Sequence, residues 1–128
     1  DAEYRRVVPI ADYSLVALDC PEPRQLAEFY RAIIGGDIVK EDDDWVELRT
    51  ANAATVAFQR APGLVVPAWP DGGPQQMHLD FDVADLDEAE RAVLAVGARK
   101  AEFQPKPGDW RVFLDPIGHP FCLVRVGS

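Results

Sequence analysis

The segment HLDFDVADLDEAERAVLAVGA, residues 78–98, contains a strand and a helix in direct succession. Apolar and polar residues alternate from His78 to Val83, which is typical of a strand with one buried face. Asp85 is a favourable N-cap, and Glu88 three residues later completes a capping box. The helix that follows ends at Gly97, and its apolar face is formed by Leu86, Ala89, Val93 and Val96.

The same order of features occurs earlier in the chain, in LDCPEPRQLAEFYRAIIGG, residues 18–36. An apolar strand over Tyr13–Cys20 is followed by prolines, which fit the first turn of a helix, and this helix ends at Gly35-Gly36. Its apolar face is formed by Leu26, Phe29, Tyr30 and Ile33. The dipeptide Asp-Trp opens a strand in each half, at residues 44–45 and 109–110. The remaining strands are expected over Trp45–Arg49, Thr55–Arg60 and Phe121–Val126.

This repetition predicts a single α+β domain over residues 1–128, built from two copies of one module. Module 1 covers about 11–61 and module 2 about 75–128, and the proline- and glycine-rich residues 62–74 are expected to form a linker. Each module has the order strand, helix, strand, strand, with a further strand possible. Since a helix covers one face of each sheet, the other faces are expected to form a cup-shaped pair of half-barrels that holds the ligand site.

Composition excludes several classes of function. The 128 residues carry a formal net charge of −9, which repels phosphate backbones, so nucleic acid is not an expected partner. The sequence has no apolar run long enough to span a membrane and no signal peptide, so a cytoplasmic protein is expected. Cys20 and Cys122 lack the spacing of a redox or metal motif and are expected to be reduced and buried.

Three segments resemble the vicinal oxygen chelate superfamily, which includes glyoxalase I, bleomycin-resistance proteins, extradiol dioxygenases and fosfomycin-resistance enzymes. Two are the segments quoted above. The third is WRVFLDPIGHPFCLV, residues 110–124, in which the Asp-Pro-x-Gly turn is similar to the closing hairpin of that superfamily. The sequences of these segments are most similar to the glyoxalase-like domain branch of the superfamily. The resemblance implies two tandem βαβββ-type modules.

The resemblance also implies where a metal would bind. In metal-using members a divalent cation in the cup is held by His, Gln or Glu from the first and last strands of the modules, and it acts as a Lewis acid. His78 matches the histidine that opens the second module. The other places carry Leu15 or Ser14, Phe58 or Gln59, and Cys122. The prediction is therefore that the protein has no metal cofactor, and that His78 is a ligand if a metal is present.

In an alternative interpretation a metal is bound, but by a different set of donor residues. Asp80 shares a strand face with His78, and Cys122 could ligate as a thiolate, which gives a His78/Asp80/Cys122 site for zinc or iron(II). His78 has a structural interpretation too, as an internal hydrogen-bonded histidine.

Other residues are candidates for ligand contact or catalysis. Glu47 lies on the expected cup face and, with His78 and Asp80, could perform metal-free acid–base chemistry. Each tryptophan is either a platform for an aromatic ligand or a packing residue. The expected ligand-binding set is Trp45, Glu47, Phe58, Gln59, Trp69, His78, Asp80, Trp110 and Cys122.

Three hypotheses for the function follow. The first is a metal-independent binder of the bleomycin-resistance type, a homodimer that sequesters an aromatic or cationic small molecule in the cup. The alternative is a lyase, isomerase or dioxygenase of the same superfamily with a metal or acid–base site around His78, so the sequence leaves open whether the protein is an enzyme. The third is a regulatory domain that contacts a partner protein through the apolar stretch Leu64–Trp69.

Overall fold

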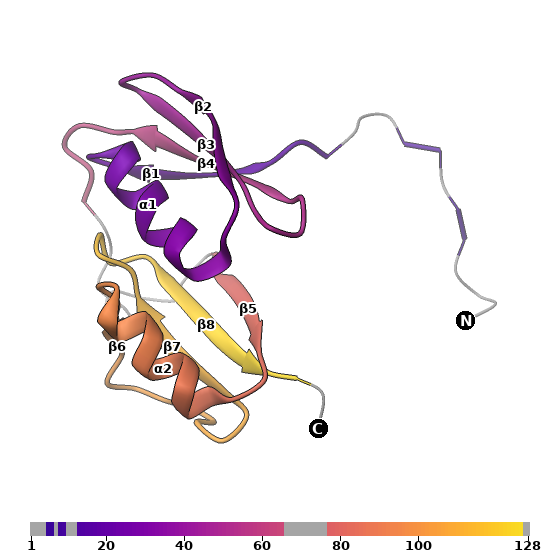
Figure 1. The fold of residues 1–128 in the computed structure, drawn as a ribbon, viewed down its shortest axis with the longest axis vertical. Helices are drawn as coiled ribbons and strands as arrows, with labels where there is room; N and C mark the ends of the chain where they lie inside the picture. The colour runs from indigo at the N-terminus through magenta and orange to yellow at the C-terminus, as the bar shows by residue number, and fades with distance from the viewer. Residues whose placement is uncertain (1–4, 7, 10–12, 66–76, 127–128) are drawn as a thin grey trace.

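A computed structural model describes residues 5–6, 8–9, 13–65 and 77–126 of the chain. It contains two four-stranded sheets, each accompanied by one helix (Figure 1). The first module consists of β1 (Val16–Cys20), α1 (Pro23–Ile34), β2 (Asp37–Glu41), β3 (Trp45–Arg49) and β4 (Thr55–Arg60). The second consists of β5 (Leu79–Val83), α2 (Leu86–Ala95), β6 (Arg99–Lys100), β7 (Trp110–Leu114) and β8 (Pro120–Arg125). The predicted α+β class is confirmed, and neither sheet closes into a barrel.

The two sheets have the same topology, which confirms the internal repeat. The strand order is β1-β4-β3-β2 in the first and β5-β8-β7-β6 in the second. In both, the first strand pairs in parallel with the last, and the other neighbours are antiparallel. Side chains repeat as well: Arg60 lies 3.8 Å from Asp44 in module 1, and Arg125 lies 3.5 Å from Asp109 in module 2.

Several element boundaries refine the prediction. β1 begins at Val16, whereas Tyr13 precedes it and is 82% exposed. The possible further strand of each module is present, as β2 and the two-residue β6. Residues 66–76, which include most of the expected linker and Trp69, lie outside the described residues. Neither described helix is long and apolar enough to cross a lipid bilayer.

Proline, capping and glycine residues explain where the two helices begin and end. Pro23 occupies the first turn of α1, and the Asp85 side chain accepts a hydrogen bond from the Glu88 backbone N–H at 3.0 Å, which caps α2. Gly36 follows α1 with φ of +106°, and a Cβ there would lie 2.0 Å from the Arg49 carbonyl oxygen. Only glycine fits this close approach between α1 and β3.

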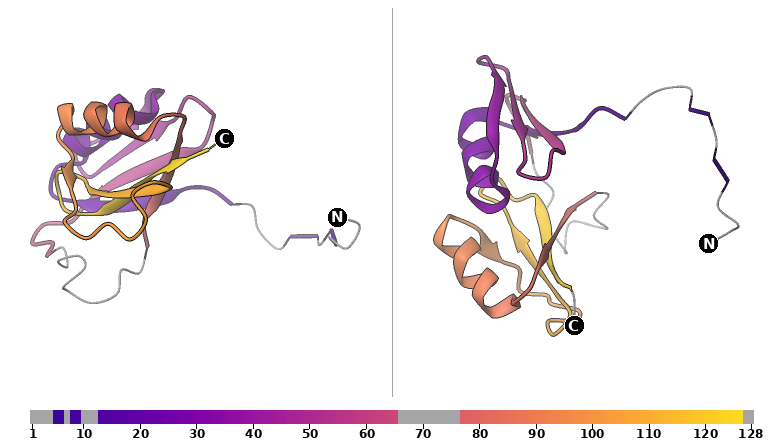
Figure 2. Two further views of the ribbon diagram at one scale, coloured as in Figure 1. Left: turned by 90° about the horizontal axis from the view of Figure 1, so that it is seen from below. Right: turned by 45° about the vertical axis from the view of Figure 1, so that its right-hand side comes forward.

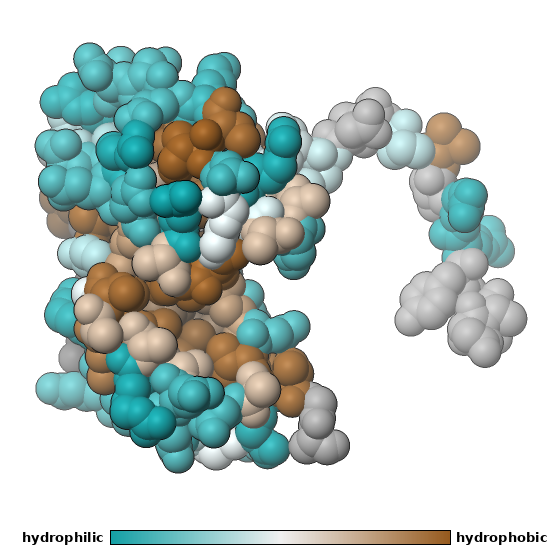
Figure 3. Space-filling view, viewed as in Figure 1, coloured by the Kyte–Doolittle hydropathy of each residue, from teal (hydrophilic) through white to brown (hydrophobic). Residues whose placement is uncertain are grey.

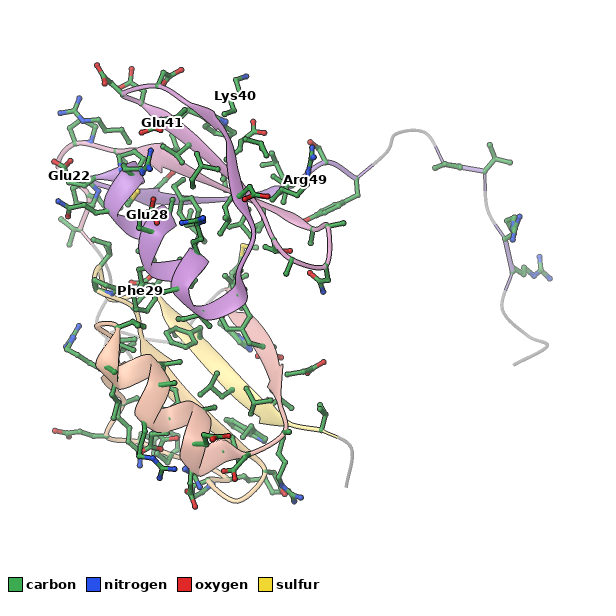
Figure 4. The ribbon with its side chains drawn as sticks, viewed as in Figure 1. Glu22, Glu28, Phe29, Lys40, Glu41 and Arg49 are labelled. Carbon is green, nitrogen blue, oxygen red and sulfur yellow. The ribbon has the colours of Figure 1, made fainter. Side chains whose placement is uncertain are left out.

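The helix-facing sides of both sheets contribute to one hydrophobic core. Helix α1 carries this core across the module boundary, because Phe29, in the middle of α1, lies on the side of the helix that faces module 2 (Figure 4). The Phe29 ring lies 6.1 Å from that of Phe121, and Tyr30 stacks on Phe58 at 5.7 Å while meeting Phe81 at 6.2 Å. The two modules are therefore packed together by aromatic side chains from both.

A buried hydrogen bond joins the modules inside this core. The Tyr30 hydroxyl donates to Oδ2 of Asp115 across 2.6 Å, and both residues are almost completely buried. Oδ1 of Asp115 accepts from the backbone N–H groups of the following turn, at Ile117, Gly118 and His119. Burial, together with the charge of Asp115, raises the pKa of the Tyr30 phenol, which keeps it protonated as a donor.

Replacement of this donor tests its contribution. We expect Tyr30→Phe to lower the free energy of unfolding by about 1–3 kcal/mol, because it leaves a buried carboxylate oxygen without a partner. Urea unfolding followed by circular dichroism measures the change. The control is Tyr13→Phe, at an exposed tyrosine, which should alter stability by less than about 0.5 kcal/mol. Equal stability of Tyr30→Phe and the unaltered chain would contradict this role.

Candidate functional site

In the described part of the chain, each sheet has one face that no helix covers. The two helices lie on one side of the molecule and the strands of both sheets lie on the other (Figure 2). We call the strand surface that points away from the helices the open face. Because side chains alternate along a strand, the register assigns to it Trp45, Glu47, Arg49, Gln59, Asp80, Asp82, Trp110, Val112, Cys122 and Val124.

On module 1, the open face presents an indole held beside a carboxylate. The Trp45 Nε1–H donates to Oε2 of Glu47 across 2.8 Å, and both side chains are half-buried. Gln59 on β4 is the register partner of Trp45, and Lys40 on β2 is the partner of Glu47. Figure 4 shows Arg49 on the side of the sheet away from α1. This half therefore combines an aromatic surface with charges of both signs.

On module 2, three possible metal donors converge. Nε2 of His78 lies 3.1 Å from Oδ1 of Asp80, and Asp80 on β5 is the register partner of Cys122 on β8. One ligand atom from each of the three residues lies within 4.8 Å of the other two. The arrangement follows from strand geometry, because residues two apart on one strand and the register partner on the next strand share a face.

The Cys122 thiol lies at the buried base of this group. It packs in a small apolar cluster with Ala101 and Val112, flanked by Trp110 and Val124. Burial, then the negative charge of Asp80 and hydrogen bonding to it, raise the pKa of Cys122 to about 11. Without a cation, the sulfur is therefore a neutral thiol at physiological pH and a poor nucleophile.

One expected site residue is not on the open face, and another lies outside the described residues. Phe58 is fully buried beneath α1, where it stacks on Tyr30, so the expectation that it contacts a ligand in the cup does not match its position. Alternation along β4 explains the difference, because it turns Gln59 outward and Phe58 into the core. Trp69 lies outside the described residues.

Some contacts that position the open face were not anticipated. Asp115 was expected only to form a turn, yet it also accepts the Tyr30 hydrogen bond. Nε2 of His119 lies 2.7 Å from the Asp19 carbonyl oxygen on β1. No periodicity marks contacts between residues so far apart in sequence. The Trp45–Glu47 bond could have been anticipated, since residues two apart on a strand share a face.

A concavity lies on the helix side of the molecule. It has a volume of about 560 Å³ and is formed between the end of α1, the turn after β3, strand β5 and α2. Figure 3 shows apolar surface in this zone between the two more polar modules. Its described lining has neither histidine nor cysteine; among the apolar members are Ala32, Ile33, Val83, Ala89, Val93 and Val96.

Two repeated α+β modules, with sheets that stay open and donors on the uncovered face, define the glyoxalase/bleomycin-resistance/dioxygenase class of proteins. The family model of the glyoxalase-like domain matches residues 15–124, and the chain belongs to this family. The resemblance to the vicinal oxygen chelate superfamily is thereby confirmed. No curated protein sequence matches the chain significantly.

Solved structures share the fold at low sequence identity. A glyoxalase/bleomycin resistance protein/dioxygenase family enzyme from Burkholderia phytofirmans is 20% identical, with a TM-score of 0.69 over 91% of this chain and 100% of that one. The fosfomycin resistance protein FosX from Mesorhizobium loti is 16% identical, with a TM-score of 0.68 over 93% and 94%. A mutant of FosX from Listeria monocytogenes, complexed with Mn(II) and 1S,2S-dihydroxypropylphosphonic acid, is 16% identical, with a TM-score of 0.71 over 93% of each chain.

The donors present do not fit a cation bridging the two modules. Ser14 and Leu15 precede β1, and Phe58 is in the core, so Gln59 is the only suitable donor at the module 1 positions that the resemblance implies. Module 2, by contrast, has three donors at its own open face. A cation held by module 2 alone fits the residues, whereas one shared by both modules does not.

Cysteine reactivity tests the environment of both thiols. Burial raises the pKa of Cys20 and of Cys122 from 9.0 to about 11, so the thiolate fraction at pH 8 falls about 100-fold. Folded, chelator-treated protein should therefore react with iodoacetamide at least that much more slowly than the urea-unfolded chain, and the folded rate should rise as pH increases toward 11. Mass spectrometry of tryptic peptides measures each cysteine. Rapid alkylation of folded protein at pH 8 would contradict these environments.

Proposed function

We propose that the protein binds a small organic molecule on its open face, and that the ligand is aromatic, cationic or both. The observation that carries this proposal is the Trp45–Glu47 pair, in which a 2.8 Å hydrogen bond orients an indole beside a carboxylate. An indole face attracts aromatic rings and cations, and a neighbouring carboxylate stabilises positive charge. Because the pair is already held in place, little side-chain entropy is lost on binding.

The second module supplies further acidic character to the same face. Asp80 has 57% of its side chain exposed, beside His78, and the chain as a whole carries a net charge of −9. An acidic surface raises the local concentration of cations and speeds their association. This supports a cationic ligand, and sequestration of such a compound is the role we propose for the protein in the cytoplasm.

Binding of the organic ligand is proposed to need no metal. The positions in module 1 that the family resemblance assigns to metal ligands carry Ser14, Leu15, Phe58 and Gln59, so no cation is expected to bridge the modules. The ligand would instead be held by aromatic and charged side chains. We also propose a homodimer, because large apolar side chains such as Tyr13, Met77 and Phe103 are exposed.

A second candidate function is an enzyme of the same superfamily, a lyase, isomerase or dioxygenase. The observation that favours it is the convergence of His78, Asp80 and Cys122. A cation there would supply a Lewis acid, and His78 or Asp80 could otherwise transfer a proton. Activity that depends on metal and is lost in His78→Ala would favour this candidate over sequestration.

Ligand binding is testable with a panel of planar aromatic cations and their neutral isosteres. We expect aromatic cations to quench tryptophan fluorescence with saturation, in buffer that contains a chelator. Glu47→Gln should weaken the affinity for the cations about fivefold to tenfold and leave the affinity for neutral isosteres nearly unchanged, because it removes charge and keeps shape.

The matched control is Glu88→Gln, at an exposed residue in the first turn of α2, on the helix side of the molecule. It should bind every compound as the unaltered chain does. If no compound of the panel binds, or if Glu47→Gln and Glu88→Gln behave alike, the proposed site is wrong.

A further inference from the structure

The geometry points to a zinc site held by His78, Asp80 and Cys122 within the second module alone. Three chemically different donors from two adjacent strands meet on one face of the sheet. The set contains one imidazole, one carboxylate and one thiol. The inference goes beyond small-molecule binding and does not rest on it, because the residues proposed to orient the organic ligand, Trp45 and Glu47, belong to the other sheet.

The spacing of the donors matches that of a tetrahedral ion after small side-chain rotations. Zinc–ligand bonds of about 2.0–2.3 Å at tetrahedral angles place donor atoms about 3.3–3.8 Å apart. The His78–Asp80 separation is 3.1 Å, and the ligand atoms of all three residues lie within 4.8 Å of one another. The His78–Asp80 separation is thus shorter than the required spacing, and the 4.8 Å limit on the group is longer than it.

The charges also match a divalent cation. Cys122 as thiolate and Asp80 as carboxylate together carry two negative charges, which neutralise the ion, while His78 contributes a neutral ring nitrogen. The thiol gives its proton to solvent when the ion binds. In addition, the strands supply the sulfur from the buried base, where Cys122 is 5% exposed, and the other two donors from the exposed rim.

The thiolate determines which metals the site prefers. Soft sulfur ligands favour zinc and disfavour magnesium, calcium and manganese, which prefer oxygen donors. The site would therefore prefer a different metal from the Mn(II) named for the Listeria FosX complex. Three protein ligands leave the fourth tetrahedral position empty, and the exposure of His78 and Asp80 places that position toward solvent on the open face. Water or an anionic group of a ligand would complete the shell.

Metal titration of the purified, chelator-treated chain tests the site. Isothermal titration with zinc should give one equivalent per chain, and magnesium and manganese should bind at least tenfold more weakly. Cobalt(II), as a spectroscopic probe, should produce a sulfur-to-metal charge-transfer band in the near ultraviolet. Cys122→Ser should abolish that band and, like His78→Ala and Asp80→Asn, weaken zinc binding by at least about tenfold.

Two matched variants serve as controls. Cys20→Ala removes the other buried cysteine, which lies in module 1, and Asp82→Asn removes the next carboxylate on the same face of β5. Both should bind zinc with one equivalent and keep the cobalt band. Circular dichroism of each metal-free variant establishes that it is folded, so that loss of metal is not loss of structure.

The inference is overturned if zinc fails to bind the folded chain, if Cys122→Ser keeps the cobalt band, or if Asp82→Asn weakens zinc binding as much as Asp80→Asn does. These outcomes are separate from those of the ligand panel, which is titrated with a chelator present. Failure of zinc binding would therefore not count against binding of the organic ligand, and the reverse also holds.

Discussion

The buried hydrogen bond between Tyr30 and Asp115 is the contact on which the arrangement of the molecule depends. Tyr30 comes from the helix of module 1, and Asp115 from the β7–β8 turn of module 2. A carboxylate this deeply buried is tolerated only when its oxygens are satisfied, and here the phenol and three backbone N–H groups do so. The same geometry brings Phe29, Phe81 and Phe121 into contact around it, so that two small sheets share one core.

That shared core has a direct consequence for the functional surface. Because both sheets direct their helix-facing sides into it, both uncovered faces are left on the same side of the molecule. Strand alternation then places Trp45 and Glu47 on one half, and His78, Asp80 and Cys122 on the other. The first half is suited to an aromatic cation and the second to a thiophilic metal ion. The duplicated fold has therefore acquired different chemistry in its two halves.

Much of this structure could be predicted from sequence, because it is encoded locally. The Asp85 cap, the glycine after each helix and the alternation in β3 and β5 all depend on residues close in sequence, and each was found where expected. The grouping of His78, Asp80 and Cys122 was predictable because the family resemblance implies metal ligands on the first and last strands of a module, and the structure pairs those strands as β5 and β8. In contrast, the Tyr30–Asp115 and His119–Asp19 contacts join distant residues, and a one-residue ambiguity in β4 left open whether Phe58 or Gln59 faces outward.

The central claim is that ligands bind the open face of the two sheets, and amide chemical-shift mapping tests it most directly. A nitrogen-15-labelled chain is titrated with whichever aromatic cation quenches its tryptophan fluorescence. We expect the largest shifts on β3 and β4, at Trp45, Glu47 and Gln59, none of which lines the concavity on the helix side of the molecule. Shifts concentrated instead on the residues that line the concavity between the helices, such as Ala32, Val93 and Val96, would contradict it.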